Sequence, residues 1–215
     1  RIVSNSPKGL FGINIGPNKD TNNKEEDYLI GLRKFYNLAD YLTINISSPN
    51  TENLRSFHNE DELNKLLDLV EKEKKILKTK IPIVVKISPD IKDENINIIA
   101  ELLLKHNVEA VIISNSTDKN RENLSNINKL EKGGLSGKPL EKRSNELINK
   151  FYKILKNKIN IIGVGGVDSG KSAYQKIING ASLVQLYTGM IYQGPSIASK
   201  ISEELIQILQ KEYLE

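Results

Sequence analysis

The chain has 215 residues, of which 38% are hydrophobic and 27% charged, and its formal net charge is +4. This composition is that of an ordinary globular domain with enough residues to bury a sizeable core. Because cysteine is absent, disulfides, thiolate metal sites and cysteine nucleophiles are excluded. Acidic and basic residues are interspersed and tryptophan is absent, so we expect no nucleic-acid binding. No apolar run approaches the roughly 20 residues that a membrane-spanning helix needs.

Short apolar, β-branched runs recur along the chain and predict strands buried on both faces, as in a parallel sheet. In chain order they are Leu10–Ile15, Tyr41–Ile46, Ile83–Ile87, Ala110–Ser114, Ile159–Val164 and Ser182–Tyr187. Helical patterns lie between them, for example over Lys92–His106, where apolar residues recur at helical spacing. Strands that alternate with helices predict a parallel α/β fold.

The alternation of strands and helices fits two architectures, an open doubly wound sheet or a (β/α) barrel. A barrel of this kind closes with about eight strands, whereas the chain supplies six apolar runs. Either the sheet is open, or two strands precede Arg1, and the spacing of the runs leaves both possibilities. No linker rich in proline, glycine or serine interrupts the chain, so we expect residues 1–215 to form one domain.

In both architectures the chemistry lies at the carboxyl ends of the strands. The segments that follow the predicted strands there are rich in amide, hydroxyl and glycine groups. They are Asn14–Gly16, Asn45–Asn50, Ser88–Asp90, Ser114–Thr117, Gly163–Gly166 and Tyr187–Gly189. They lack histidine, cysteine and carboxylate pairs, so we expect a bound cofactor to supply chemistry that these side chains cannot.

Lys86 is unusual because it stands inside the apolar run Ile83–Ile87. Burying a cation without a partner is costly, so we expect its ammonium to face an anion or an electron-rich group. The alternative is that the side chain extends to solvent at the end of the strand.

The two histidines, His58 and His106, are far apart and lack the spacing of metal ligands. We expect both to lie on the surface or at helix ends, and we expect no metal site.

Gly165–Ser172 matches the pattern of a nucleotide phosphate-binding loop, and it follows a strand and precedes a helix. The strand run after it, Ser182–Tyr187, ends without the acidic residue that would help to hold Mg²⁺. We therefore expect phosphate to bind near Gly165 and Gly166, and we treat a nucleotide hydrolase as the alternative function.

Five motifs together resemble those of class 2, quinone-dependent dihydroorotate dehydrogenases. They are Gly12–Gly16, Asn45–Thr51, Gly133–Gly137, Ile161–Val167 and Leu183–Tyr187, in the family's order from Gly12 to the C-terminus. The resemblance implies a (β/α)8 TIM barrel that binds FMN, with about six of its eight strand–helix units present here. It also implies that the first two strands and a small helical N-terminal region lie before Arg1.

The resemblance assigns roles to individual residues. Ser48 matches the general base, which takes a proton from C5 of dihydroorotate while hydride passes from C6 to the flavin. The residues expected to bind FMN are Asn14, Asn45, Lys86, Ser114, Gly137, Gly166, Tyr187 and Thr188. The residues expected to bind the pyrimidine are Asn45, Asn50, Asn115 and Ser116.

The resemblance also implies partners and a location. Class 1 relatives have cysteine where Ser48 stands, so a serine here indicates class 2, whose flavin is reoxidised by a membrane quinone. The implied function is the oxidation of dihydroorotate to orotate in pyrimidine (UMP) biosynthesis. The implied location is peripheral, on the cytoplasmic side of a bacterial membrane or on the mitochondrial inner membrane.

Two departures from the family matter. Glu52 and Asn53 replace a common Pro-Gly pair, so the loop that carries Ser48 loses residues that set turn geometry. The missing N-terminal part would hold a further pyrimidine-binding asparagine and most of the quinone site. A flavin-binding remnant without turnover therefore stands as a second alternative.

Overall fold

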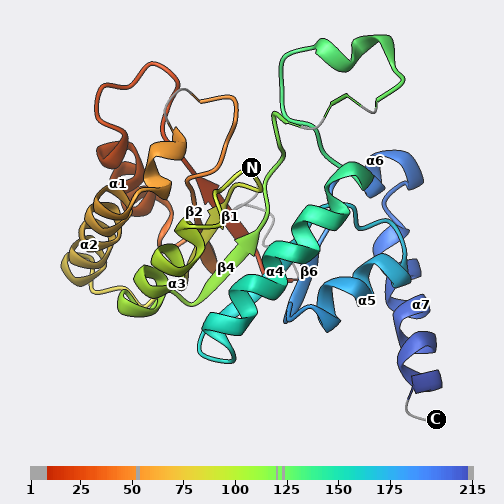
Figure 1. Ribbon diagram of the computed structural model, residues 1–215. Helices are drawn as coiled ribbons and strands as arrows, with labels where there is room; N and C mark the ends of the chain where they lie inside the picture. The colour runs from red at the N-terminus through yellow and green to blue at the C-terminus, as the bar shows by residue number, and fades with distance from the viewer. Residues whose placement is uncertain (1–8, 52–53, 120, 123, 213–215) are drawn as a thin grey trace.

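The computed structural model describes residues 9–212, except residues 52–53, 120 and 123. Parallel strands form one curled sheet, and the chain runs through helices between them (Figure 1). The strands are β1 (Gly12–Ile15), β2 (Tyr41–Asn45), β3 (Ile83–Ile87), β4 (Ala110–Ile113), β5 (Asn160–Val164) and β6 (Leu183–Gln185). The helices are α1 (Lys24–Phe35), α2 (Glu60–Ile76), α3 (Asn95–Lys105), α4 (Glu141–Leu155), α5 (Gly170–Ile178), α6 (Thr188–Gln193) and α7 (Ile197–Glu212). Short 3-10 turns are η2 (Leu54–His58), η3 (Ile127–Leu130) and η4 (Lys138–Leu140).

The order of the strands in the sheet distinguishes the two architectures. The sheet runs β1-β2-β3-β4-β5-β6, so every strand pairs in parallel with its neighbour in the chain. A doubly wound sheet reverses its strand order at a switch point, and this sheet does not. The arrangement is a curled half-barrel with the strand order of a TIM barrel, which confirms the barrel prediction and excludes the open alternative.

The two faces of the sheet bury different side chains, as the two-residue period of a strand requires. On β4, Val111 and Ile113 join the main core beneath the helices, with Leu66, Ile99, Phe151 and many others. Ala110 and Ile112 point to the other face, where they form a small cluster with Val84 and Ile162. This second cluster fills the concave side of the sheet below the carboxyl ends of the strands.

Arg33 ties the first two helices together. From α1 its guanidinium donates to both carboxylate oxygens of Glu73 on α2, at 2.9 and 2.8 Å, and it also pairs with Glu26 at 2.6 Å. These hydrogen bonds raise the pKa of the Arg33 guanidinium and lower the pKa of the Glu73 carboxyl. The pair belongs to the helix layer, between α1 and α2.

Candidate functional site

A cleft of about 600 Å³ opens at the carboxyl ends of the strands. It is lined by Lys86 of β3, by residues of the loops that follow β2, β4, β5 and β6, and by the long segment between β4 and α4. Predicted site residues in its wall are Asn50, Lys86, Ser114, Asn115, Ser116, Gly137, Gly166, Tyr187 and Thr188. A second cleft of about 720 Å³, between α1 and α2, contains none of the predicted residues and is lined by Lys24, Glu25, Asp61 and other polar groups. The first cleft is therefore the candidate site.

One end of this cleft is a backbone cradle formed by Gly137, Gly165 and Gly166, which we call the glycine cradle. All three have positive φ angles, of 79°, 116° and 76° respectively. A Cβ on Gly166 would lie 2.9 Å from Cα of Glu141, and one on Gly137 would lie 2.9 Å from Cγ2 of Thr188. Side chains other than glycine would therefore be strained and crowded at both places.

The amide groups of the glycine cradle are available to an anion. Within the described part of the chain, the N–H groups of Gly137 and Gly166 donate to no protein acceptor. Backbone N–H groups that converge without partners form a concavity that suits phosphate. The observed cradle thus fits the phosphate end of a flavin nucleotide.

Lys86 lies on β3 between the two ends of the cleft and is half-buried. It lines the cleft, and no carboxylate among the described residues pairs with it. Burial lowers the pKa of its ammonium, because a charged group loses hydration there. A desolvated cation that faces the cleft fits the expectation that Lys86 meets an electron-rich group, and it does not fit a side chain that extends to solvent.

At the other end of the cleft is a set of side chains that we call the amide rim: Asn45, Ser47, Asn115 and Ser116. Asn115 and Ser116 line the cleft, and Asn45 and Ser47 support them from the end of β2. Oδ1 of Asn45 accepts the hydroxyl of Ser47 at 2.7 Å and its N–H at 3.2 Å. Nδ2 of Asn115 donates to Oγ of Ser47 at 2.9 Å, and Oδ1 of Asn115 accepts the N–H of Ser116 at 2.8 Å. The rim therefore connects the end of β2 to the end of β4 through side chains.

Ser47 was missed by sequence reasoning, which took its neighbour Ser48 as the functional serine. Ser47 is fully buried and sits between the two asparagines, so it orients both of them. The signal available was its place two residues after Asn45, just beyond the end of β2.

Three predicted residues do not line the cleft. Asn14 is exposed on β1, and Asn45 is half-buried at the end of β2, where its Oδ1 accepts the hydroxyl of Ser47. Ser48 is half-buried beside Asn50, whose N–H donates to its Oγ at 3.2 Å. Ser48 thus contacts Asn50, which lines the cleft, but does not line the cleft itself. Glu52 and Asn53 of the same loop lie outside the described residues.

Both histidines lie at helix ends, as expected, and both are also buried: His58 ends η2, and His106 is the C-cap residue of α3. His58 is 6% exposed, and its Nε2 accepts the N–H of Ser88 at 3.4 Å. Burial, and then the charge of Arg55, lower the pKa of His58 to about 4. His106 is 7% exposed and lies within hydrogen-bond distance of Glu71 and Asn64 on α2. Polar partners from distant segments make the burial of both histidines possible. No cluster of potential metal ligands occurs among the described residues.

The apparent nucleotide loop is not formed as one. Oγ of Ser172 accepts the N–H groups of Asp168 and Ser169 as part of a helix-capping box, so it is not free for Mg²⁺. The N–H of Gly170 donates to the carboxylate of Glu204 on α7, and Lys171 is exposed. Of the motif, Gly165, Gly166 and Val167 line the cleft.

Within the described ranges, no helix combines the length and the apolar character needed to cross a membrane.

Comparisons with known proteins agree on one family. The family model for dihydroorotate dehydrogenase matches residues 2–209. The chain is 47% identical to "Dihydroorotate dehydrogenase (quinone)" of Nitrosomonas europaea over 200 residues, which are 90% of this chain and 58% of that protein. It is 45% identical to the protein of the same name from Idiomarina loihiensis over 210 residues, 95% of this chain and 63% of that one.

A solved structure shows the same fold. The Eimeria tenella DHODH in complex with ferulenol superposes with a TM-score of 0.92 at 36% identity, over 97% of this chain and 60% of that one. The chain therefore spans about three fifths of the length of the relatives that it matches. With the matched family model, these relatives show that the chain belongs to the dihydroorotate dehydrogenase family.

Proposed function

We propose that this chain is the flavin-binding barrel of a quinone-linked dihydroorotate dehydrogenase, which oxidises dihydroorotate to orotate for pyrimidine (UMP) synthesis. The observation that carries the proposal is one cleft with the glycine cradle at one end, the amide rim at the other and Lys86 between them. A phosphate site, a cation and a set of amides in this order match the parts of a flavin nucleotide with a pyrimidine beside it.

Family membership implies a flavin, and we propose FMN. The N–H groups of Gly137 and Gly166 would hold its phosphate, with Tyr187 and Thr188 closing the same end of the cleft. Lys86 and Ser114 would lie along the ring, where the ammonium stabilises negative charge. Asn14 and Asn45 would complete the binding of the ring from β1 and β2. The bound flavin supplies the hydride acceptor that protein side chains lack.

The pyrimidine would lie against the amide rim. Amide groups donate and accept hydrogen bonds together, so Asn45, Asn50, Asn115 and Ser116 can satisfy the imide and carboxylate edges of a flat ring. Ser48 would remove the proton from C5 of dihydroorotate. A serine is a weak base in water, so this role requires that water be excluded and that a relay accept the proton.

The quinone and the location follow from relatives that carry the quinone name. We propose a membrane quinone as the oxidant that returns the flavin to its starting state, with the protein peripheral to the membrane. On this proposal residues 1–215 act as one domain, and the quinone site lies mostly outside the residues that the structure describes.

The test is spectroscopic. The purified protein should show the absorbance bands of an oxidised flavin, and dihydroorotate should bleach them under anaerobic conditions without quinone. A colourless protein that accepts no added FMN would contradict the proposal. A yellow protein that dihydroorotate leaves unbleached would indicate a flavin-binding remnant without turnover. The intact mass of the purified protein should be measured as well, to show whether the tested protein consists of these 215 residues or of a longer chain.

A further inference from the structure

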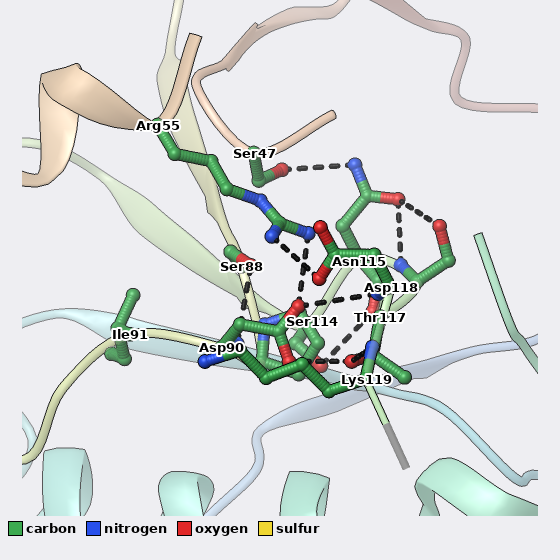
Figure 2. A network of polar contacts seen from close by, with 12 residues as sticks. Ser47, Arg55, Ser88, Asp90, Ile91, Ser114, Asn115, Thr117, Asp118 and Lys119 are labelled. Carbon is green, nitrogen blue, oxygen red and sulfur yellow. Dashed lines mark hydrogen bonds and ion pairs between the residues drawn. The ribbon is translucent and has the colours of Figure 1, made fainter. Parts of the chain in front are cut away.

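Arg55 is the one charged residue of the 3-10 turn η2, which follows the loop that carries Ser48 and Asn50. Figure 2 shows its guanidinium pointing away from its own turn, towards the loops that follow β3 and β4. Its side chain is only 25% exposed, and the carboxylates that balance its positive charge are on segments distant in sequence. The residue belongs to neither the glycine cradle nor the amide rim.

The guanidinium meets two carboxylates from two other loops. Nη2 lies 2.9 Å from Oδ2 of Asp90, which follows β3, and Nη1 donates to Oδ1 of Asp118, which follows β4, at 2.9 Å (Figure 2). Partial burial raises the pKa of the Asp118 carboxyl, but hydrogen bonds with Arg55 and Asp90 and the charge of Arg55 outweigh it, and the net pKa is lowered. The Asp118 carboxyl is therefore charged at neutral pH.

Asp90 extends the contact into the β4 loop. Its Oδ1 accepts the hydroxyl of Thr117, and its Oδ2 accepts the N–H of Asp118 at 3.4 Å. Its own N–H is held by Oγ of Ser88 at 3.1 Å. The side chain of Asp90 is only 7% exposed, so the Asp90 half of the junction is shielded from water, whereas the Asp118 side chain is 51% exposed.

A second contact fixes the same turn. His58, one helical turn after Arg55, accepts the N–H of Ser88 through Nε2. Because its pKa is lowered to about 4, this imidazole is neutral at neutral pH and keeps the lone pair that the contact needs. The turn η2 is therefore attached to the β3 loop at both of its ends.

Such a junction contributes little to stability in itself. Nε of Arg55 is buried and donates to no group among the described residues, and Nη2 meets Asp90 without hydrogen-bond alignment. Buried ion pairs with incomplete hydrogen bonding are often no better for stability than apolar side chains of the same size. The contacts of Arg55 instead fix the positions of three segments relative to one another: η2, the loop after β3 and the loop after β4.

We propose that Arg55 is a positioning residue for the reaction, one that sets the loop of Ser48 and Asn50 against the strand ends that carry Lys86 and Asn115. The inference rests on the proposed function, because it concerns how the general base meets the pyrimidine. Displacement of a reacting group by about 1 Å can reduce a rate roughly 10²-fold, so an indirect residue of this kind has a measurable effect on catalysis.

The matched control is Arg33, which also bridges two carboxylates but does so between α1 and α2. Arg55→Met and Arg33→Met remove the same charge and keep a similar length of side chain. Arg55→Lys is the conservative variant: one ammonium cannot bond two carboxylates with the forked geometry of a guanidinium, so we expect partial recovery. Asp90→Asn provides a second way to break the junction if Arg55→Met does not fold.

The experiment uses the flavin-loaded protein and three readouts. These are flavin content, the rate of flavin bleaching by dihydroorotate without quinone, and hydrogen exchange of peptides from residues 46–58 and 141–155. Arg55→Met should keep its flavin, bleach roughly 10²-fold more slowly, and exchange faster only in residues 46–58. Asp90→Asn should change the same readouts in the same direction, and Arg33→Met should leave the bleaching rate at the parental value.

Bleaching of Arg55→Met at the parental rate would overturn the inference. So would a fall in flavin content and melting temperature that accounts for the whole loss of rate, because that result indicates a merely structural role. If the parent protein itself binds no flavin or is not bleached, the proposed function fails. The hydrogen exchange of residues 46–58 then still decides whether Arg55 holds the loop: unchanged exchange in Arg55→Met overturns the positioning role, and faster local exchange supports it.

Discussion

The two ends of the cleft are built in different ways. The glycine cradle is made of backbone: its shape comes from positive φ angles and from the close approach of Glu141 and Thr188. The amide rim is made of side chains from β2 and β4 that hold one another through Ser47. A backbone site is lost by adding atoms, whereas a side-chain site is lost by removing them.

The difference also indicates what each end can do. Fixed N–H groups suit a phosphate that stays bound, because nothing has to move when the ligand is held. Amides and hydroxyls can reorient, so they suit a substrate that enters and leaves in each cycle. The following predictions test this division, from the largest expected effect to the smallest.

Gly166→Ala should abolish flavin binding. The new Cβ would lie 2.5 Å from Cβ of Glu141, in a backbone conformation that costs an L-residue about 1–2 kcal/mol. Gly194→Ala is the matched control, because its φ is +83° but a Cβ there meets nothing within 4 Å. We expect Gly194→Ala to lose some stability and keep its flavin. A yellow Gly166→Ala protein with normal FMN affinity would contradict the assignment of the cradle.

Ser48→Ala should keep the flavin and lose roughly 10²- to 10⁴-fold in the rate of flavin reduction, the usual range for a general base. Ser47→Ala should reduce that rate less but weaken orotate binding, because Asn45 and Asn115 lose their shared partner. Stopped-flow bleaching by dihydroorotate and titration with orotate separate the two effects. If Ser47→Ala loses more rate than Ser48→Ala, the general base is Ser47 and the assignment of Ser48 is wrong by one residue.

Lys86→Met should slow flavin reduction by roughly 10²-fold or weaken FMN binding, because a cation that stabilises the charge of the reduced ring is removed. Lys74→Met, at a half-buried lysine on α2 that pairs with Glu109, should change neither property. Equal FMN affinity and equal bleaching rates in Lys86→Met and the parent would show that Lys86 has only a structural role.

Lys171→Ala should have almost no effect, since the residue is exposed and lies outside the cleft. Assays of dihydroorotate oxidation and of ATP binding test this expectation. A large loss of activity accompanied by loss of ATP binding would restore the nucleotide-loop alternative.

Sequence reasoning was most successful where one segment carries its own signal. The β-branched runs predicted all six strands, and the rule about strand ends selected Lys86, Ser114 and Gly166, which all line the cleft. It failed where a residue depends on distant partners. His58 is buried because Ser88 supplies its hydrogen bond, and the contact of Arg55 with Asp90 joins segments whose proximity no local pattern reveals. The choice between barrel and open sheet likewise depended on strand order, which spacing along the chain does not encode.

The order of the strands also has a consequence for how the protein is made. Each strand after β1 pairs with the strand synthesised just before it, and α7 packs on α5, which also lies close by in the chain. Each of these parallel pairings still closes a crossover of tens of residues, so strand pairing is slower than in a helical bundle with local contacts. Translation delivers about 5–20 residues per second, so each strand–helix unit can dock on its predecessor before the next one leaves the ribosome. The half-barrel can thus grow from its N-terminal edge in the direction of synthesis, without waiting for a later segment to complete any of its strand pairs.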